Sequence, residues 1–177
     1  MTDWIKAINP TAPITTRPEA TAAARASALA ILLGVAFGIF GVVRTMGVGT
    51  EAMEAMMVEN AQGDAAVAGM AGAMAGAVVY FSIGMVVVQA IFGLVQWAKP
   101  NRFIPILFII LVVLGLLSSV WGLAMASQMD VPANVQAPLW LTVLTLVVLL
   151  VELVLHIAGL RGASRLDQLK KAEFPNS

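Results

Sequence analysis

Two ionisable side chains, Glu152 and His156, lie within one of the most apolar stretches of the chain. Residues 139–157 are otherwise aliphatic, apart from Trp140 and two threonines. A run of this length with apolar residues on every face is typical of a transmembrane helix. An ionisable group inside a membrane costs roughly 2.5–3.5 kcal/mol on insertion scales, so it should face protein or water. Glu152 therefore indicates where the polar interior of the molecule lies.

Three further polar groups can be placed near Glu152 by helical spacing. His156 follows one turn later on the same helical face, and Thr145 lies on that face seven residues earlier. Gln89, in an earlier apolar run, lies about 12 Å above the end of its segment, and Glu152 lies about 13 Å above the end of its own. We therefore expect an intramembrane polar site formed by Glu152, His156, Gln89 and Thr145. Its most specific contact would be a hydrogen bond from the Gln89 amide to the Glu152 carboxyl.

This polar site has two interpretations. In the functional one, Glu152 titrates and handles protons or cations, with His156 as relay or partner. In the structural one, Glu152 is a hydrogen-bonded acid that holds helices together or docks a helix of a partner. His156 fits the structural interpretation readily, because it lies close to the headgroup level, where an imidazole costs little.

Small residues recur at four-residue spacing in two of the apolar segments. Gly34 and Gly38 form one such pair, and Gly72 and Gly76 form another. This spacing lets helix backbones approach closely. The pairs indicate either tight packing within the protein or a face for another copy or another subunit.

A group of methionines follows the first apolar segment. Met53, Met56 and Met57 fall on one face of a helix, and thioethers are soft ligands suited to Cu(I). The sequence fits better an amphipathic helix that lays these side chains on the membrane or on a partner. We therefore expect no metal site and no cofactor.

Four segments are long enough to cross the membrane, and they position these residues. They cover residues 22–43, 72–98, 103–126 and 139–160. The short connection 99–102 makes the second and third segments an antiparallel hairpin. We expect one all-α integral membrane domain over residues 1–177, an up-down bundle of four transmembrane helices.

The basic residues indicate how this bundle is oriented. Nine of the ten Lys and Arg residues fall in or beside segments 1–25, 99–102 and 161–177, and only Arg44 lies on the opposite side. By the positive-inside rule, both the N-terminal segment 1–21 and the tail 161–177 are cytoplasmic. Short interfacial helices are expected near the N-terminus, where Trp4, Ile5 and Ile8 have helical spacing, and in the first external loop.

Composition restricts the function. The chain is 60% hydrophobic with zero formal net charge, so it has no global field that would attract nucleic acid. It has no cysteine and one histidine, which excludes thiolate sites and multi-histidine metal sites built by one chain. No nucleotide-binding or hydrolase motif is present.

These observations predict a non-catalytic small membrane protein rather than an enzyme. The preferred interpretation is an accessory or structural subunit of a larger membrane complex. The alternative is a small oligomeric transporter or channel in which Glu152 couples protons or cations. Its partners would be the lipid bilayer and other subunits or copies of itself, without nucleic acid. The richness in Ala, Gly and Val suggests the cytoplasmic membrane of a bacterium.

Overall fold

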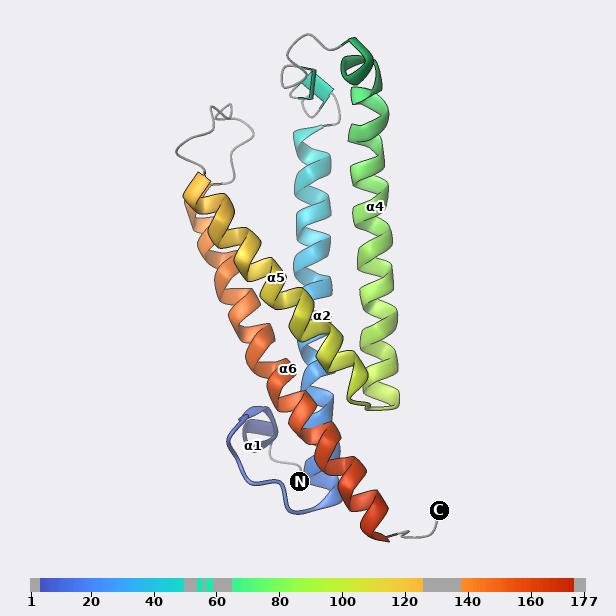
Figure 1. Cartoon of the computed structure of the whole chain (residues 1–177), viewed down its shortest axis with the longest axis vertical. Coiled ribbons are helices and arrows are strands. Elements are labelled where there is room, and N and C mark those ends of the chain that lie inside the picture. Colours follow the sequence, from blue (N-terminus) through green and yellow to red (C-terminus); the bar gives the residue numbers. More distant parts are fainter. Residues whose placement is uncertain (1–3, 50–53, 56, 59–64, 126–137, 174–177) are drawn as a thin grey trace. The chain divides into compact units, whose positions relative to one another are not determined.

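In a computed structural model, the described part of the chain is helical. The structure describes residues 4–49, 54–55, 57–58, 65–125 and 138–173. The helices are α1 (Trp4–Ile8), α2 (Arg17–Val48), α4 (Ala65–Ala98), α5 (Phe103–Met125) and α6 (Leu139–Glu173), as shown in Figure 1.

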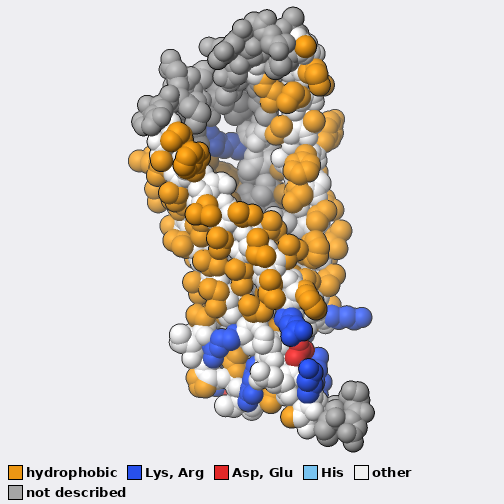
Figure 2. Space-filling view, in the orientation of Figure 1, with side chains coloured by type: hydrophobic (Ala, Val, Ile, Leu, Met, Phe, Trp, Pro, Cys, Tyr) orange, Lys and Arg blue, Asp and Glu red, His pale blue; other side chains and the backbone are white. Residues whose placement is uncertain are grey.

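Within these residues, four helices are long and apolar enough to cross a membrane. The qualifying segments are Arg17–Gly47, Gly69–Ala98, Phe103–Met125 and Leu139–Ala172. Large apolar side chains are exposed along them, and Figure 2 shows hydrophobic side chains covering much of the visible helical surface. Such a surface suits a lipid environment, in which apolar side chains face hydrocarbon. The prediction of a helical protein with four helices long and apolar enough to span a membrane is confirmed for the described residues, and it is consistent with an integral membrane protein.

The chain divides into two compact units. Unit 1 contains Met1–Gly34 and Ala90–Ser177, and unit 2 contains Val35–Gln89. Unit 1 thus holds α1, α5, α6, the first half of α2 and the end of α4. Unit 2 holds the second half of α2 and most of α4.

Two helices of unit 1 begin with capping interactions that their sequences encode. At the start of α2, the backbone N–H of Glu19 donates to Thr16 Oγ1 over 3.4 Å, and Glu19 Oε2 accepts from the N–H of Thr16 over 3.1 Å. This reciprocal pair is a capping box. At the start of α5, Asn101 Oδ1 accepts hydrogen bonds from the N–H groups of Phe103 and Ile104. Both caps satisfy backbone donors that the first helical turn leaves without intrahelical partners.

Helices α5 and α6 form an antiparallel pair (Figure 1). Phe108 stacks on His156, with ring centroids 5.4 Å apart, and Gly115 faces Leu149. A step of seven residues forward on α5 therefore matches a step of seven residues back on α6.

The helices extend beyond the segments that hydropathy predicted. The predicted segment 22–43 lies within α2, and the predicted 139–160 is the first part of α6. Helix α6 continues without a break through the segment 161–171, which is rich in charged residues, to Glu173. At 1.5 Å per residue, its 35 residues span about 52 Å, which exceeds the hydrocarbon thickness of about 30 Å.

Candidate functional site

The closest helix contact in unit 1 joins α2 to α6 through small residues. A methyl group built on Gly159 would lie 2.4 Å from Cβ of Ser27, and one built on Gly162 would lie 2.2 Å from the backbone nitrogen of Ala24. Carbon contacts are normally 3.5–4.0 Å. Only glycine fits at these two positions with the helices this close. Along this contact, Ala24, Ser27 and Gly34 of α2 lie opposite Gly162, Gly159 and Glu152 of α6. The paired residues therefore follow one another in opposite directions along the two helices.

His156 is fully buried beside this contact. Its Nδ1 and Ser27 Oγ are 2.8 Å apart and share a hydrogen bond. One ring face lies against Phe108 of α5. His156 Nε2 has no hydrogen-bond partner among the residues that the structure describes. In a neutral imidazole one nitrogen donates and the other accepts, so a hydroxyl that donates to Nδ1 would leave the proton on Nε2.

Glu152 lies one turn before His156 on the same contact between α2 and α6. It is 8% exposed, and a methyl group on Gly34 would lie 2.9 Å from Glu152 Oε1. The absence of a side chain at Gly34 therefore makes room for the carboxyl group. Glu152 is nine residues from Arg161 and twelve from Trp140, which places it about 13 Å and about 18 Å from these two positions along the helix.

The other two predicted members of the polar site behave differently. Thr145 Oγ1 donates to the carbonyl of Leu141 in its own helix over 2.8 Å. Gln89 belongs to unit 2 and Glu152 to unit 1, so a hydrogen bond between them stays a prediction.

Among the predicted packing glycines, three have close neighbours. Gly34 adjoins Glu152, Gly38 faces Val86 of unit 2, where an added methyl group would lie 2.9 Å from Cγ2, and Gly72 lies against the Glu54 carboxyl group, also of unit 2. An added methyl group on Gly76 would meet no atom within 4 Å in the described structure.

The methionine hypothesis falls mainly outside the described residues. Met53 and Met56 are not among them, so the expected helical face that they share with Met57 stays a prediction. Within the part that the structure describes, no group of three or more His, Asp or Glu side chains is placed to hold a metal ion.

Two polar residues of unit 1, Ser27 and Gln96, make contacts with other elements that the sequence did not predict. Ser27 is the hydrogen-bond partner of His156, yet a serine in an alanine-rich segment carries no signal of its own. Gln96 is fully buried; its amide nitrogen donates to the carbonyls of Ala24 and Asn101, and its oxygen accepts from the N–H of Asn101. Its position three residues before the 99–102 turn was the available signal.

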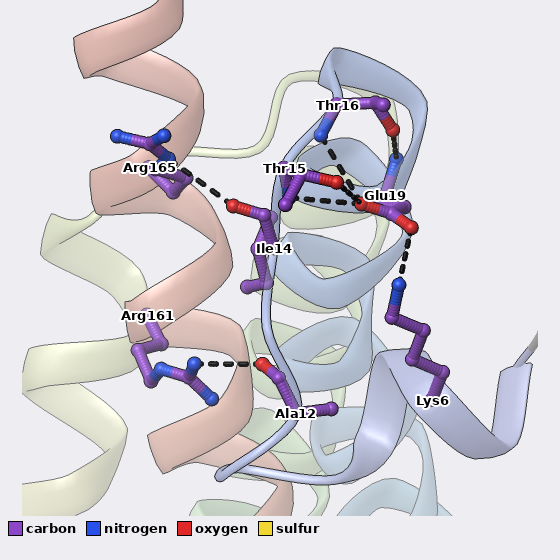
Figure 3. Close-up of polar contacts among 8 residues, drawn as sticks. All are labelled: Lys6, Ala12, Ile14, Thr15, Thr16, Glu19, Arg161 and Arg165. Carbon is purple, nitrogen blue, oxygen red and sulfur yellow. Dashed lines mark hydrogen bonds and ion pairs between the residues drawn. The ribbon is translucent and has the colours of Figure 1, made fainter.

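A second polar cluster connects helix α6 with the segment that precedes α2, as Figure 3 shows. Arg161 donates to the carbonyls of Pro10 and Ala12, and Arg165 donates to the carbonyl of Ile14 over 3.2 Å. We call these contacts between the segment 10–14 and α6 the terminal clasp.

An ion pair joins α1 to the start of α2 beside this clasp. Lys6 Nζ contacts Glu19 Oε1, and the other oxygen of Glu19 accepts from the backbone and hydroxyl of Thr15 (Figure 3). Glu19 precedes the apolar segment 22–43. The Lys6 ammonium and, after it, the hydrogen bonds from Thr15 and Thr16 hold the pKa of the Glu19 carboxyl well below its usual range.

The sequence matches no known protein family, and no curated protein and no solved structure is significantly similar to it. Unit 1 contains two clusters of polar contacts between elements that are far apart in the sequence. The buried one between α2, α5 and α6 joins helices and contains two groups that can exchange a proton, Glu152 and His156. Its geometry can stabilise helix packing and could also relay protons.

Proposed function

We propose that the chain is a non-catalytic subunit of a larger membrane assembly. The observation that carries this proposal is the hydrogen bond between His156 and Ser27 at the closest approach of α2 and α6. The lone histidine is thereby engaged in helix packing, through its hydrogen bond to Ser27 and its stacking on Phe108. A catalytic imidazole would instead need access to a substrate.

Open glycine surfaces support the assembly part of the proposal. Gly76 and Gly84 on α4 and Gly122 on α5 would each accept a methyl group with no described atom within 4 Å. Glycine weakens a helix by about 1 kcal/mol relative to alanine, so glycines on open faces need another purpose. In membranes, small residues on a helix surface allow a second helix to approach closely.

Native mass spectrometry of the protein, extracted gently from its own membrane, tests this function. We expect a defined complex with unrelated polypeptides. Gly76→Leu should release those polypeptides while leaving helical content unchanged, whereas Val87→Leu, on an exposed part of the same helix, should not. A complex containing only copies of this chain would contradict the accessory role.

The alternative function is a small oligomeric transporter or channel with Glu152 as its coupling site. It is supported by the His156 nitrogen that has no partner among the described residues, one turn from a buried carboxyl group. Gly34→Ala would displace the Glu152 carboxyl without changing its chemistry, and Glu152→Gln would remove its proton exchange. If the alternative holds, both variants reduce proton-linked flux in reconstituted vesicles; unchanged flux in Glu152→Gln would exclude it.

We further propose that both termini are cytoplasmic, in the cytoplasmic membrane of a bacterium. In unit 1, Lys and Arg side chains cluster at one end, which Figure 2 shows at the bottom of the view. The positive-inside rule places such an end in the cytoplasm. A reporter active only in the cytoplasm should be inactive when fused at Gly63 and active when fused after the last residue. The reverse result would invert the orientation.

A further inference from the structure

A cavity of about 390 Å³ lies in unit 1 between α1 and the first turns of α2. This volume is in the range of small-ligand sites, roughly 300–1,000 Å³. Two of the described lining residues carry guanidinium groups. Its lining residues are Trp4, Arg17, Pro18, Thr21, Ala22 and Arg25.

The guanidinium of Arg25 is held in place by a tryptophan pair. Its Nε donates to the carbonyl of Trp97 over 3.2 Å, and its central carbon lies 5.1 Å from the centroid of a Trp97 ring. Trp97 in turn stacks on Trp4, with centroids 6.2 Å apart and planes 9° from parallel. A guanidinium has five N–H donors. With Nε–H used, the two terminal nitrogens retain donors in the fork geometry that matches a phosphate.

The surroundings of the cavity favour a ligand that is charged at one end and apolar at the other. Arg25 lies about one turn inside the apolar segment that begins at Ala22. Next to the tryptophan pair, Ile5 on α1 is 80% exposed and Leu94 on α4 is 65% exposed. Tryptophan is enriched at the headgroup level of membranes, because its ring is apolar and its N–H is polar. A free phosphate ion would use the guanidinium groups and leave this apolar surface bare.

We propose that this cavity binds the phosphate headgroup of an anionic phospholipid. Arg25 contacts the phosphate through its terminal nitrogens, and Arg17 contributes a second positive charge. The acyl chains extend past the tryptophan pair along the exposed apolar side chains. Thr21 contributes shape rather than a donor, because its hydroxyl already donates to the carbonyl of Arg17.

Lipid titration followed by native mass spectrometry tests the proposal. Purified, delipidated full-length protein is titrated separately with phosphatidylglycerol, phosphatidylcholine and inorganic phosphate. We expect one phosphatidylglycerol to be retained at concentrations about tenfold below those needed for phosphatidylcholine, and no retention of inorganic phosphate. Arg25→Gln should weaken phosphatidylglycerol retention about tenfold, since it removes the oriented fork. Arg17→Gln should weaken it about fivefold through its charge.

Arg102→Gln is the matched control. It removes the same charge from the same unit, but Arg102 lies over Phe103 and does not line the cavity. This variant should retain phosphatidylglycerol like the unaltered protein. Equal retention by Arg25→Gln and Arg102→Gln would overturn the site, and retention of inorganic phosphate at matching concentration would overturn the lipid assignment. If circular dichroism shows that Arg25→Gln loses helical content, the retention of phosphatidylglycerol by Arg17→Gln and Arg25→Lys tests the site instead. Full retention by both would refute the proposal.

Discussion

Replacing Gly162 by alanine tests the contact between α2 and α6. The added methyl group would lie 2.2 Å from the backbone nitrogen of Ala24 and 2.5 Å from the carbonyl carbon of Ala23. Normal contact needs at least about 3.5 Å, so the helices must separate locally by about 1.3 Å. Overpacking of this kind costs about 1–3 kcal/mol. The separation would also stretch the Ser27–His156 hydrogen bond, whose loss adds about 1 kcal/mol.

Alanine favours a helix over glycine by up to about 1 kcal/mol, which offsets part of this cost. We therefore expect Gly162→Ala to lower the free energy of unfolding by about 1–3 kcal/mol. The measurement is equilibrium unfolding in mixed micelles with increasing dodecyl sulfate, followed by far-ultraviolet circular dichroism.

Gly122→Ala on α5 is the control, because its added methyl group meets no described atom within 4 Å. It should be neutral or slightly stabilising. The two atoms nearest to the methyl group of Gly162→Ala belong to the backbone of α2. Adding Ala24→Gly removes only a side chain, so the double variant should not regain the lost stability. If Gly162→Ala is no more destabilising than Gly122→Ala, the reasoning about this contact is refuted.

Three further predictions concern polar contacts in unit 1. Ser27→Ala leaves both nitrogens of the buried His156 without a partner among the described residues, and should lower the free energy of unfolding by about 1–3 kcal/mol in the same assay. Gln96→Leu removes the bonds that join the 99–102 turn to α2, and should destabilise the protein by about 1–3 kcal/mol, with faster amide exchange in that turn. The depressed pKa of Glu19 implies a contribution to stability that is fully present above its ordinary value near 4.5 and is lost as the pH falls below it. Glu19→Gln should therefore flatten the acid limb of the curve of stability against pH.

Each of these predictions has a result that would count against it. A Ser27→Ala variant as stable as the parent would mean that the His156 bond contributes nothing to packing. Unchanged exchange in the turn would show that Gln96 does not fasten the hairpin. An acid limb that is identical with and without Glu19 would mean that its ion pair with Lys6 does not form in solution.

Hydropathy located the apolar helices well. Polar side chains cost free energy in lipid, so a segment that crosses a membrane consists mainly of apolar residues. The predicted segment 103–126 begins where α5 begins, with Ala126 outside the described residues, and the predicted end of the second segment, Ala98, is the last residue of α4. Hydropathy could not locate the end of α6. Helical continuity through 161–173 depends on propensity and on contacts with the N-terminal segment, and residues such as Leu, Lys and Arg favour a helix as much in water as in lipid.

The candidate site was predictable only where a residue contrasts with its surroundings. Glu152 and His156 contrast with an aliphatic run, and the structure buries both. Ser27 and Gly162 give no such contrast, since one lies among alanines and the other among charged residues. Their role depends on the register between α2 and α6, which pairs residues about 130 positions apart and is set by three-dimensional packing.

The terminal clasp has a consequence for the order in which the protein is made. Its donors and acceptors are separated by about 150 positions in the chain, with sequence separations of 149 and 151 for the bonds to Ala12 and Pro10. At roughly 5–20 residues per second, the ribosome reaches Arg161 about 8–30 s after it has made the segment 10–14. During that interval the carbonyls of this segment lack the arginine donors of the clasp. Closure of the clasp is therefore a late event of biogenesis, and it can occur only after the last helix has been synthesised.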